Sequence, residues 1–270
     1  AFNRMYEFTS IEEENKGSIN ISKFNSLEIK NLSFRFAGSK ELFRNINISV
    51  HKNECIAIVG ESGSGKSTIG QVLQKFYPFE NGEIIVNNEQ NLPKVNTEDW
   101  RNIIGIIPQE INIFSGNVVS NILLSKEDTP ENIENFCKQY GFTEFVNSLP
   151  QGFATILGEE GINLSGGQKQ IIALMRVLYK KPQLVLLDEF TSAMDRKTEQ
   201  FVLNLLNKLK SELTIIFISH RLHSLPKIAD RIYVLENGII SDFGNHEKLM
   251  ESKNFYSEFW TELKLEKRTE

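Results

Sequence analysis

The sequence Gly60-Glu61-Ser62-Gly63-Ser64-Gly65-Lys66-Ser67 decides the fold, because it fits G-x-x-x-x-G-K-[ST] at every defined position. Glycines let backbone N–H groups approach and surround a phosphate, including in φ > 0 conformations. A helix beginning near Lys66 would direct its positive N-terminal end at the same anion. Lysine here neutralises phosphate charge, and Ser67 offers a hydroxyl to Mg²⁺. We predict that the residues from Gly60 to Thr68 bind ATP with Mg²⁺; the alternative is a glycine-rich turn that binds nothing.

The segments on both sides of this loop have the pattern that such a site requires. Residues 55–59 form a short apolar run, which is typical of a strand buried on both faces of a parallel sheet. Apolar residues at helical spacing follow the loop, and Pro78 is expected to end that helix. They are Ile69, Val72, Leu73 and Phe76. Two further apolar runs, at 184–187 and 214–218, flank a helical stripe, so we predict an α/β fold with a mainly parallel sheet.

The N-terminal region and residues 110–180 have patterns that differ from the apolar runs of the parallel sheet. Residues 27–36 and 46–50 alternate apolar with polar side chains, which predicts an antiparallel strand layer near the N-terminus. Asn81-Gly82 is expected to form a turn before the next strand. Residues 110–180 have a mostly helical pattern, with Pro130 at a helix start. The sequence shows no internal repeat.

Two acids directly follow the second apolar run. Asp188 and Glu189 are expected at the carboxyl edge of the sheet, where open α/β folds bind ligands. Asp188 is then placed to hold Mg²⁺, and Glu189 to polarise an attacking water as a general base. The alternative for such a pair is a solvated strand end, and the phosphate-binding loop upstream favours the functional interpretation.

A second anion site is predicted at Leu164-Ser165-Gly166-Gly167-Gln168. A serine and two glycines stand there before a helical apolar pattern, so free N–H groups, a hydroxyl and a helix dipole would meet. An NTPase with a single site does not need two such sites. We therefore predict that this segment contacts the γ-phosphate of an ATP held by a second copy of the chain.

Six short motifs in one order make the chain resemble the nucleotide-binding domains of ABC transporters. They are Walker A (60–67), the Q-loop glutamine (Gln109), the ABC signature (164–168), Walker B (184–189), the D-loop (192–195) and the H-loop histidine (His220). The resemblance covers about residues 25–247. It implies a P-loop NTPase core with a mainly parallel sheet, an antiparallel β layer near the N-terminus, and an inserted helical signature subdomain at about 110–182. Residues 1–24 would be a linker from a transmembrane domain, and residues 248–270 a helical extension.

The resemblance also implies roles for single residues. Glu189, His220 and Gln109 would be catalytic, with His220 contacting the γ-phosphate. Gln109 would also join Ser67 and Asp188 around Mg²⁺. A lone histidine is more often a surface or core residue, but this one directly follows a buried-strand run.

Two positions depart from the usual pattern of the family. Met194 of the D-loop stands where leucine is common, next to Asp195, which is expected among the nucleotide-binding residues. The aromatic residue that stacks on adenine is typically tyrosine, and the matching position is Phe36, which keeps the π-face. Because Phe34 stands nearby, the alternative for Phe36 is an ordinary strand core residue.

Several stretches are similar to those of exporters. They include residues 155–161, which resemble a loop that touches transmembrane coupling helices, and residues 114–116, 220–222 and 229–232. Residues 4–14 resemble the tether between a transmembrane domain and its motor domain. The implied protein is the ATPase motor of an exporter at the cytoplasmic face of a membrane. Its implied partners are a second copy in an ATP-sandwich dimer and a transmembrane domain of the same full-length chain.

Composition limits the alternatives. Apolar residues make up 40% and charged residues 24% of the chain, as in ordinary globular proteins. A net charge of −5 argues against nucleic-acid binding, which usually needs a basic face. Cys55 and Cys137 lack metal-ligand spacing. No apolar run approaches the roughly 18–20 residues of a membrane span.

Two other functions remain open from the sequence. One is a soluble ABC ATPase that acts on DNA or ribosomes; the chain lacks the sustained heptads of the first kind and the tandem domains of the second. The other is a regulatory module that binds ATP without hydrolysing it. The presence of Glu189 and His220 argues against such a degenerate site.

Overall fold

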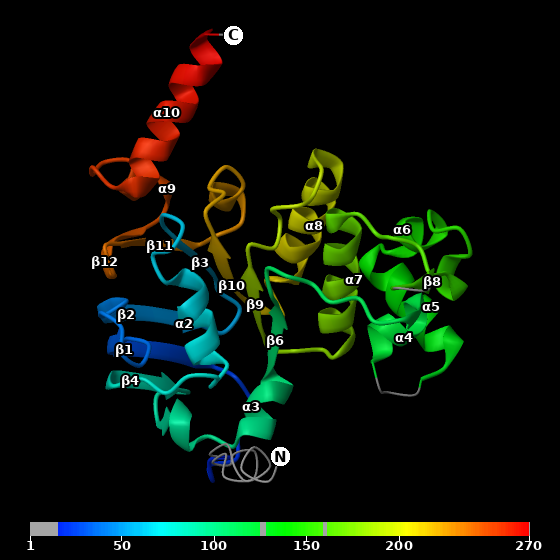
Figure 1. The fold of residues 1–270 in the computed structure, drawn as a ribbon, viewed down its shortest axis with the longest axis horizontal. Helices are drawn as coiled ribbons and strands as arrows, with labels where there is room; N and C mark the ends of the chain where they lie inside the picture. Colours follow the sequence, from blue (N-terminus) through cyan, green and yellow to red (C-terminus); the bar gives the residue numbers. More distant parts are fainter. Residues whose placement is uncertain (1–15, 125–127, 159–160, 270) are drawn as a thin grey trace, which may run out of the picture.

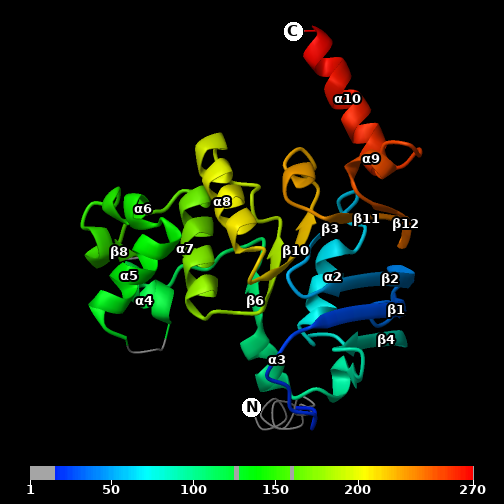
Figure 2. The ribbon, with the colours of Figure 1, turned by 180° about the vertical axis from the view of Figure 1, so that it is seen from behind.

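The computed structural model describes residues 16–124, 128–158 and 161–269 of the chain. Figure 1 shows the strands of the two main sheets on one side and a group of helices, drawn in green and yellow, on the other. The last helix, drawn in red, points away from both parts in Figures 1 and 2. Among the helices that the structure describes, none combines the length and apolar character that a membrane span requires.

The central sheet has six strands in the order β12-β11-β3-β10-β9-β6. The strands are β3 (Cys55–Val59), β6 (Ile104–Ile107), β9 (Leu184–Asp188), β10 (Thr214–Ser219), β11 (Arg231–Glu236) and β12 (Ile239–Gly244). Neighbouring strands are parallel except β11 and β12, which are antiparallel. The predicted mainly parallel sheet is confirmed.

The apolar runs of this sheet are buried on both faces, because alternate side chains enter two different cores. In β3, Ala57 and Val59 pack into the core shared with the helical part. Ile56 and Ile58 pack into the core shared with the second sheet. All four side chains are 0% exposed. A strand that faces two cores has no polar alternation, which is the pattern from which it was predicted.

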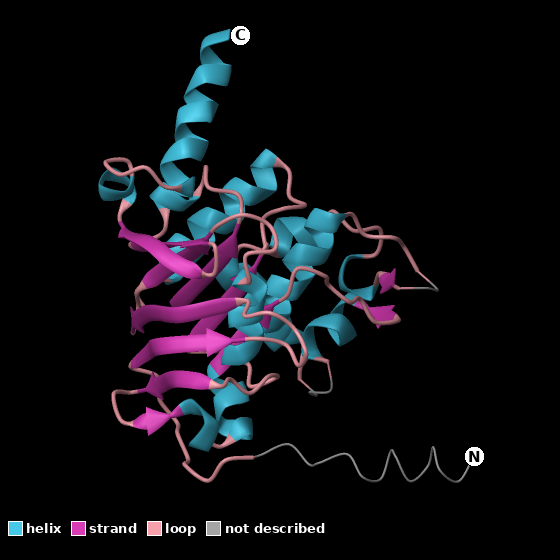
Figure 3. Cartoon of the chain, turned by 60° about the vertical axis from the view of Figure 1, so that its left-hand side comes forward, coloured by secondary structure: helices cyan, strands magenta, loops and turns pink. Residues whose placement is uncertain are grey.

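The second sheet has four antiparallel strands in the order β2-β1-β4-β5, stacked on the left in Figure 3. They are β1 (Ser26–Phe34), β2 (Phe43–His51), β4 (Asn81–Val86) and β5 (Gln90–Asn91). The predicted antiparallel layer is confirmed, but the expected turn at Asn81-Gly82 is wrong, since both residues belong to β4. A Cβ on Gly82 would lie 2.6 Å from backbone atoms of Asn31 and Leu32, so glycine lets β4 approach β1 closely.

Helix α2 (Lys66–Leu73) begins at the predicted residue, but it ends before Pro78. The N–H of Phe76 bonds to the carbonyl of Gln71 at 3.0 Å, and Lys75 has φ 64°. This is the pattern of a Schellman motif, in which a left-handed residue ends the helix. Phe76 is therefore outside the helix and 58% exposed, and the prediction that Pro78 stops the helix is wrong.

The region between the Q-loop and β9 is mostly helical, as predicted. Its helices are α4 (Val118–Leu123), α5 (Pro130–Tyr140), α6 (Thr143–Asn147) and α7 (Gly166–Tyr179). The short strands β7 (Gly116–Asn117) and β8 (Ile156–Leu157) pair within it. Pro130 is at the first position of α5, with Thr129 as its N-cap, which confirms that helix start.

The remaining elements complete the fold. They are α3 (Thr97–Ile103), α8 (Arg196–Leu209), α9 (His246–Leu249), α10 (Phe255–Thr269) and short 3-10 helices at Leu92–Lys94, Gly152–Ala154 and Leu225–Lys227. The division into a linker, an ATPase domain and a C-terminal extension stays a prediction.

The N-terminal segment contacts the second sheet before residue 25, where the linker was expected to end. Phe24 is 1% exposed and belongs to the second core. The N–H of Ser18 bonds to the carbonyl of Lys94 at 2.9 Å. The expected exporter-like tether at residues 4–14 lies outside the described residues.

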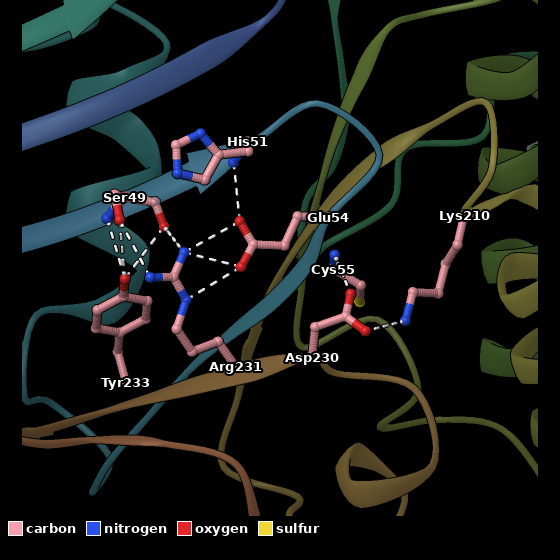
Figure 4. A network of polar contacts seen from close by, with 8 residues as sticks. All are labelled: Ser49, His51, Glu54, Cys55, Lys210, Asp230, Arg231 and Tyr233. Atoms are coloured by element: carbon pink, nitrogen blue, oxygen red, sulfur yellow. Dashed lines mark hydrogen bonds and ion pairs between the residues drawn. The ribbon is translucent and has the colours of Figure 1, made fainter.

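A network of polar contacts joins the starts of β3 and β11 (Figure 4). Asp230 accepts hydrogen bonds from the N–H of Cys55 at 2.8 Å and from Nζ of Lys210. Arg231 donates from Nε and Nη2 to the two oxygens of Glu54 at 3.1 and 3.0 Å. These contacts hold two parallel strands in register at the edge opposite the glycine-rich loop. They give a structural role to the exporter-like stretch at 229–232.

We expect Arg231→Ala to lower the free energy of unfolding by about 1–2 kcal/mol, because Glu54 would keep a largely buried carboxylate without its cation. Urea denaturation followed by circular dichroism measures the loss. Lys30→Ala is the matched control, since Lys30 pairs with Glu28 where both side chains are more than 40% exposed. Exposed pairs contribute roughly 0–1 kcal/mol. Equal losses in the two variants would contradict the proposed role of the network.

Candidate active site

One cavity of about 770 Å³ contains most of the predicted site. It lies where the glycine-rich loop leaves β3 and enters α2. The predicted residues that line it are Phe36, Glu61, Ser62, Gly63, Gly65, Lys66, Ser67, Thr68, Gln109, Glu189 and His220. The fold therefore brings these predicted residues, which come from five separate segments of the chain, to one cavity.

The loop has the backbone geometry that explains its glycines. Gly63 and Gly65 have φ values of 80° and 98°, in the left-handed region that glycine enters without strain. A Cβ on Gly65 would lie 3.1 Å from carbon atoms of Leu42 and Phe43. A Cβ on Gly60 would lie 2.1 Å from the carbonyl oxygen of Leu235, so that glycine permits close packing on β11.

Lys66 is the cation inside this loop. Its Nζ donates to the carbonyl oxygens of Gly60 at 3.0 Å and Glu61 at 2.7 Å. Burial lowers the pKa of Lys66, while the nearby carboxylates of Glu189 and Asp188 act in the opposite direction. An anion in the cavity would favour the charged lysine for the same electrostatic reason. The loop thus holds a largely buried ammonium group at the wall of the cavity.

Ser67 lines the cavity and contacts Asp188. The Ser67 hydroxyl donates to Oδ1 of Asp188 at 3.1 Å. Burial raises the pKa of Asp188, and the carboxylate of Glu189 adds to that effect, whereas the Ser67 hydrogen bond and Lys66 lower it. A hydroxyl and a carboxylate are oxygen ligands of the kind that Mg²⁺ takes together with phosphate oxygens and waters. The two side chains therefore fit the predicted magnesium site.

Glu189 and His220 follow two adjacent strands, since β9 and β10 are parallel neighbours. Nδ1 of His220 lies 2.6 Å from Oε2 of Glu189. Glu189 is only 7% exposed, so this contact with His220 is made by a largely buried carboxylate. Its φ is 50°, a conformation that costs a non-glycine residue about 1–3 kcal/mol. A strained, buried carboxylate that lines the same cavity as the phosphate loop fits the predicted general base.

Phe36 stands at the cavity and not in the core. It is 39% exposed and lines the hollow, whereas Phe34 is 3% exposed and belongs to the second core. The geometry therefore favours the functional interpretation of Phe36 over the alternative of an ordinary core residue.

The signature segment lies at a different place. Ser165, Gly167, Gln168 and Asp195 line a second hollow of about 650 Å³, so the structure does not bring them together with Lys66. Ser165 and Gln168 form a capping box at the start of α7, and a Cβ on Gly166 would lie 2.6 Å from Cβ of Ala193.

Two of the residues predicted to bind nucleotide, Asp195 and Leu164, have side chains that stabilise the fold. The carboxylate of Asp195 caps α8 by accepting from the N–H and the hydroxyl of Thr198 and from the N–H of Lys197, and these hydrogen bonds lower its pKa. Leu164 is 7% exposed and its side chain belongs to the first core, so only its backbone is available to a ligand.

Three cavity residues were not predicted: Leu42, Phe255 and Phe259. Leu42 lies between β1 and β2, and the two phenylalanines lie one turn apart on α10. Aromatic residues at i and i+4 are more often core than ligand contacts, so their spacing alone carried no functional signal.

The geometry and the motifs agree with comparisons to known proteins. The family profile described as ABC transporter matches residues 43–192, which is more than half of the chain. The chain belongs to the ABC transporter family. The predicted family and the P-loop NTPase fold are confirmed.

Relatives within this family include a protein named as a putative export ATP-binding/permease protein of Rickettsia bellii, 38% identical over 242 residues, with 89% of this chain and 42% of that protein covered. The chain is 37% identical over 239 residues to the ATP-dependent lipid A-core flippase of Haemophilus influenzae, covering 87% of this chain and 40% of that protein. It is 37% identical over 235 residues to the multidrug resistance-like ATP-binding protein of Buchnera aphidicola, with 87% and 40% covered. The chain spans less than half the length of these relatives.

A solved structure of an ABC exporter is also similar to this chain. The structure of a bacterial Atm1-family ABC exporter with ATP bound superposes with a TM-score of 0.88 and 31% sequence identity. The superposition covers 97% of this chain and 46% of that one. This ABC chain is therefore an ATP-binding domain and ATPase of the exporter type, as predicted.

Proposed function

We propose that this ABC domain hydrolyses Mg-ATP to power export of a substrate across a membrane, from the cytoplasmic face. Two copies would close around ATP and separate after hydrolysis, while transmembrane domains move the substrate. The observation that carries the proposal is the single cavity that holds the glycine-rich loop, Gln109, Glu189 and His220. Relatives that are named as a flippase and as a multidrug resistance-like protein support a role in export.

Within this cavity each residue has a proposed task. The loop N–H groups and Lys66 bind the β- and γ-phosphates. Ser67, Asp188 and Gln109 hold Mg²⁺, which neutralises charge on the phosphates when bound. Glu189 accepts a proton from the attacking water, and His220, 2.6 Å from it, contacts the γ-phosphate and keeps the water in place.

The second hollow supports the participation of a second copy. At the start of α7 Ser165 is exposed, and the capping box uses the N–H groups of Ser165 and Gln168 but not the N–H of Gly167. Because these groups line a different hollow from the loop, the ATP that they contact would be the ATP bound to another chain. The structure of the Atm1-family exporter, which has ATP bound, offers a template for such an assembly.

The nucleotide site is tested by removing its cation. We expect Lys66→Ala to weaken ATP binding by about 10-fold or more, because the phosphates lose a buried charge-assisted contact worth about 1.5–3 kcal/mol. Titration calorimetry with ATP measures the change. Lys138→Ala is the control, since Lys138 pairs with Glu134 on the exposed surface of α5, outside the cavity lining.

Ser67→Ala should have a different effect. The loop cation stays, so affinity for nucleotide without metal is retained, while the enhancement of binding by Mg²⁺ is reduced. Unchanged ATP affinity in folded Lys66→Ala protein would reject the cavity as the nucleotide site.

A further inference from the structure

Phe36 is packed against two other aromatic rings. Its centroid lies 5.0 Å from that of Phe34 and 5.3 Å from that of Tyr77, with an interplanar angle of 88° in both pairs. Edge-to-face geometry of this kind is favourable for aromatic pairs. Phe34 belongs to the core strand β1, so it fixes Phe36 from behind. Tyr77 is 39% exposed and holds Phe36 from the surface side.

The position of Tyr77 is set by the end of α2. The N–H groups of Lys75 and Phe76 bond to the carbonyls of Val72 and Gln71 in the Schellman motif, which reverses the chain just before Tyr77. Lys75 Nζ donates to the carbonyl of Val95 and the hydroxyl of Thr97, both at 2.7 Å. The turn is thus tied to a neighbouring segment and presents Tyr77 in a fixed place.

Both ends of helix α2 therefore contribute to the cavity. Lys66, at the first residue of α2, belongs to the phosphate loop. Tyr77, just beyond the last turn of α2, contacts the ring that lines the same cavity. A rigid helix keeps the distance between the phosphate contact and the aromatic contact constant.

We propose that Tyr77 is a positioning residue for base recognition: it holds the Phe36 ring in the orientation that stacks on a purine. The proposal rests on the proposed function of the cavity. An aromatic ring without such support would lose rotamer freedom when the base binds, and that entropy would be subtracted from affinity. Tyr77 acts through its ring, so phenylalanine at this position should be sufficient.

Titration calorimetry on the whole chain tests the proposal with two probes, Mg-ATP and inorganic tripolyphosphate. We expect Tyr77→Ala to weaken Mg-ATP binding about 3- to 10-fold, which corresponds to the loss of one aromatic pair. Tripolyphosphate binding should stay unchanged, since it has no base, and this also reports an intact fold. Tyr77→Phe should restore ATP affinity to within about two-fold. Phe76→Ala, which removes an adjacent ring that is 58% exposed, is the matched control.

A double-mutant cycle with Phe36→Ala separates positioning from a general structural effect. If Tyr77 acts through Phe36, Tyr77→Ala should cause no further loss of ATP affinity in the Phe36→Ala background. The proposal is overturned if Tyr77→Ala leaves ATP affinity unchanged, lowers affinity for both probes equally, or costs as much without Phe36 as with it. Failure of the proposed function would look different, because wild-type protein and Lys66→Ala would then bind tripolyphosphate equally.

Discussion

Replacing Glu189 with glutamine is expected to lower ATP turnover by at least about 100-fold while ATP binding survives, because general-base catalysis contributes roughly 10²–10⁴-fold. Glutamine keeps the size and hydrogen-bonding capacity of the side chain but cannot accept a proton from water. The buried position and the left-handed φ of 50° should be tolerated equally by both residues. The loss should therefore appear in kcat and not in nucleotide affinity.

The chain provides a matched control for this variant. Glu199 also pairs with a histidine, His223, at 3.2 Å, but this pair lies outside the cavity lining. Glu199→Gln should leave turnover within about two-fold of wild type if only the base matters. Steady-state phosphate release at saturating Mg-ATP, together with calorimetric affinity, measures both variants. A Glu189→Gln protein that hydrolyses ATP near the wild-type rate would remove Glu189 from the mechanism.

The sequence allowed the central sheet and the phosphate loop to be predicted because each pattern has one physical cause. Residues 55–59 have no polar alternation because both faces of β3 are buried. The loop needs left-handed backbone at Gly63 and Gly65, so glycine appears at those positions. Glu189 and His220 each directly follow an apolar run, which predicted that both residues lie at the carboxyl edge of the sheet. Parallel pairing of β9 with β10 brings the two residues together.

Other features were missed because their signal depends on tertiary contacts. The end of α2 has Lys75 in the left-handed position where glycine is usual, and contacts with Val95 and Thr97 compensate for it. Gly82 marks a close approach of two strands and not a turn. Phe255 and Phe259 line the cavity because the start of α10 lies beside it, which a local pattern cannot predict.

The division of the predicted site into two hollows has a direct consequence for assembly. Ser165 lines one hollow and Lys66 the other, so a complete ATP site requires two chains if both segments contact one nucleotide. Bound ATP would then hold the dimer together, and hydrolysis would release it. Stopping hydrolysis should make the dimer persist long enough to be measured.

The last prediction is that Ser165→Arg abolishes the ATP-dependent dimer. In the Glu189→Gln background, saturating Mg-ATP should shift the chain from monomer to dimer in light scattering. Adding Ser165→Arg should return it to monomer, because a bulky cation would occupy the place of the γ-phosphate at the start of α7, while ATP binding to the monomer survives. Ser211→Arg, the same substitution at an exposed position outside both hollows, is the control.

Mixing two inactive proteins makes this test sharper. Ser165→Arg and Lys66→Ala variants each lack one half of the composite site, so a mixed dimer would contain one site with both halves intact. Recovery of ATPase activity on mixing would require the signature of one chain to act on the nucleotide of the other. A Glu189→Gln protein that stays monomeric with Mg-ATP at high concentration, together with unchanged ATPase activity in Ser165→Arg, would mean that Ser165 takes no part across the dimer.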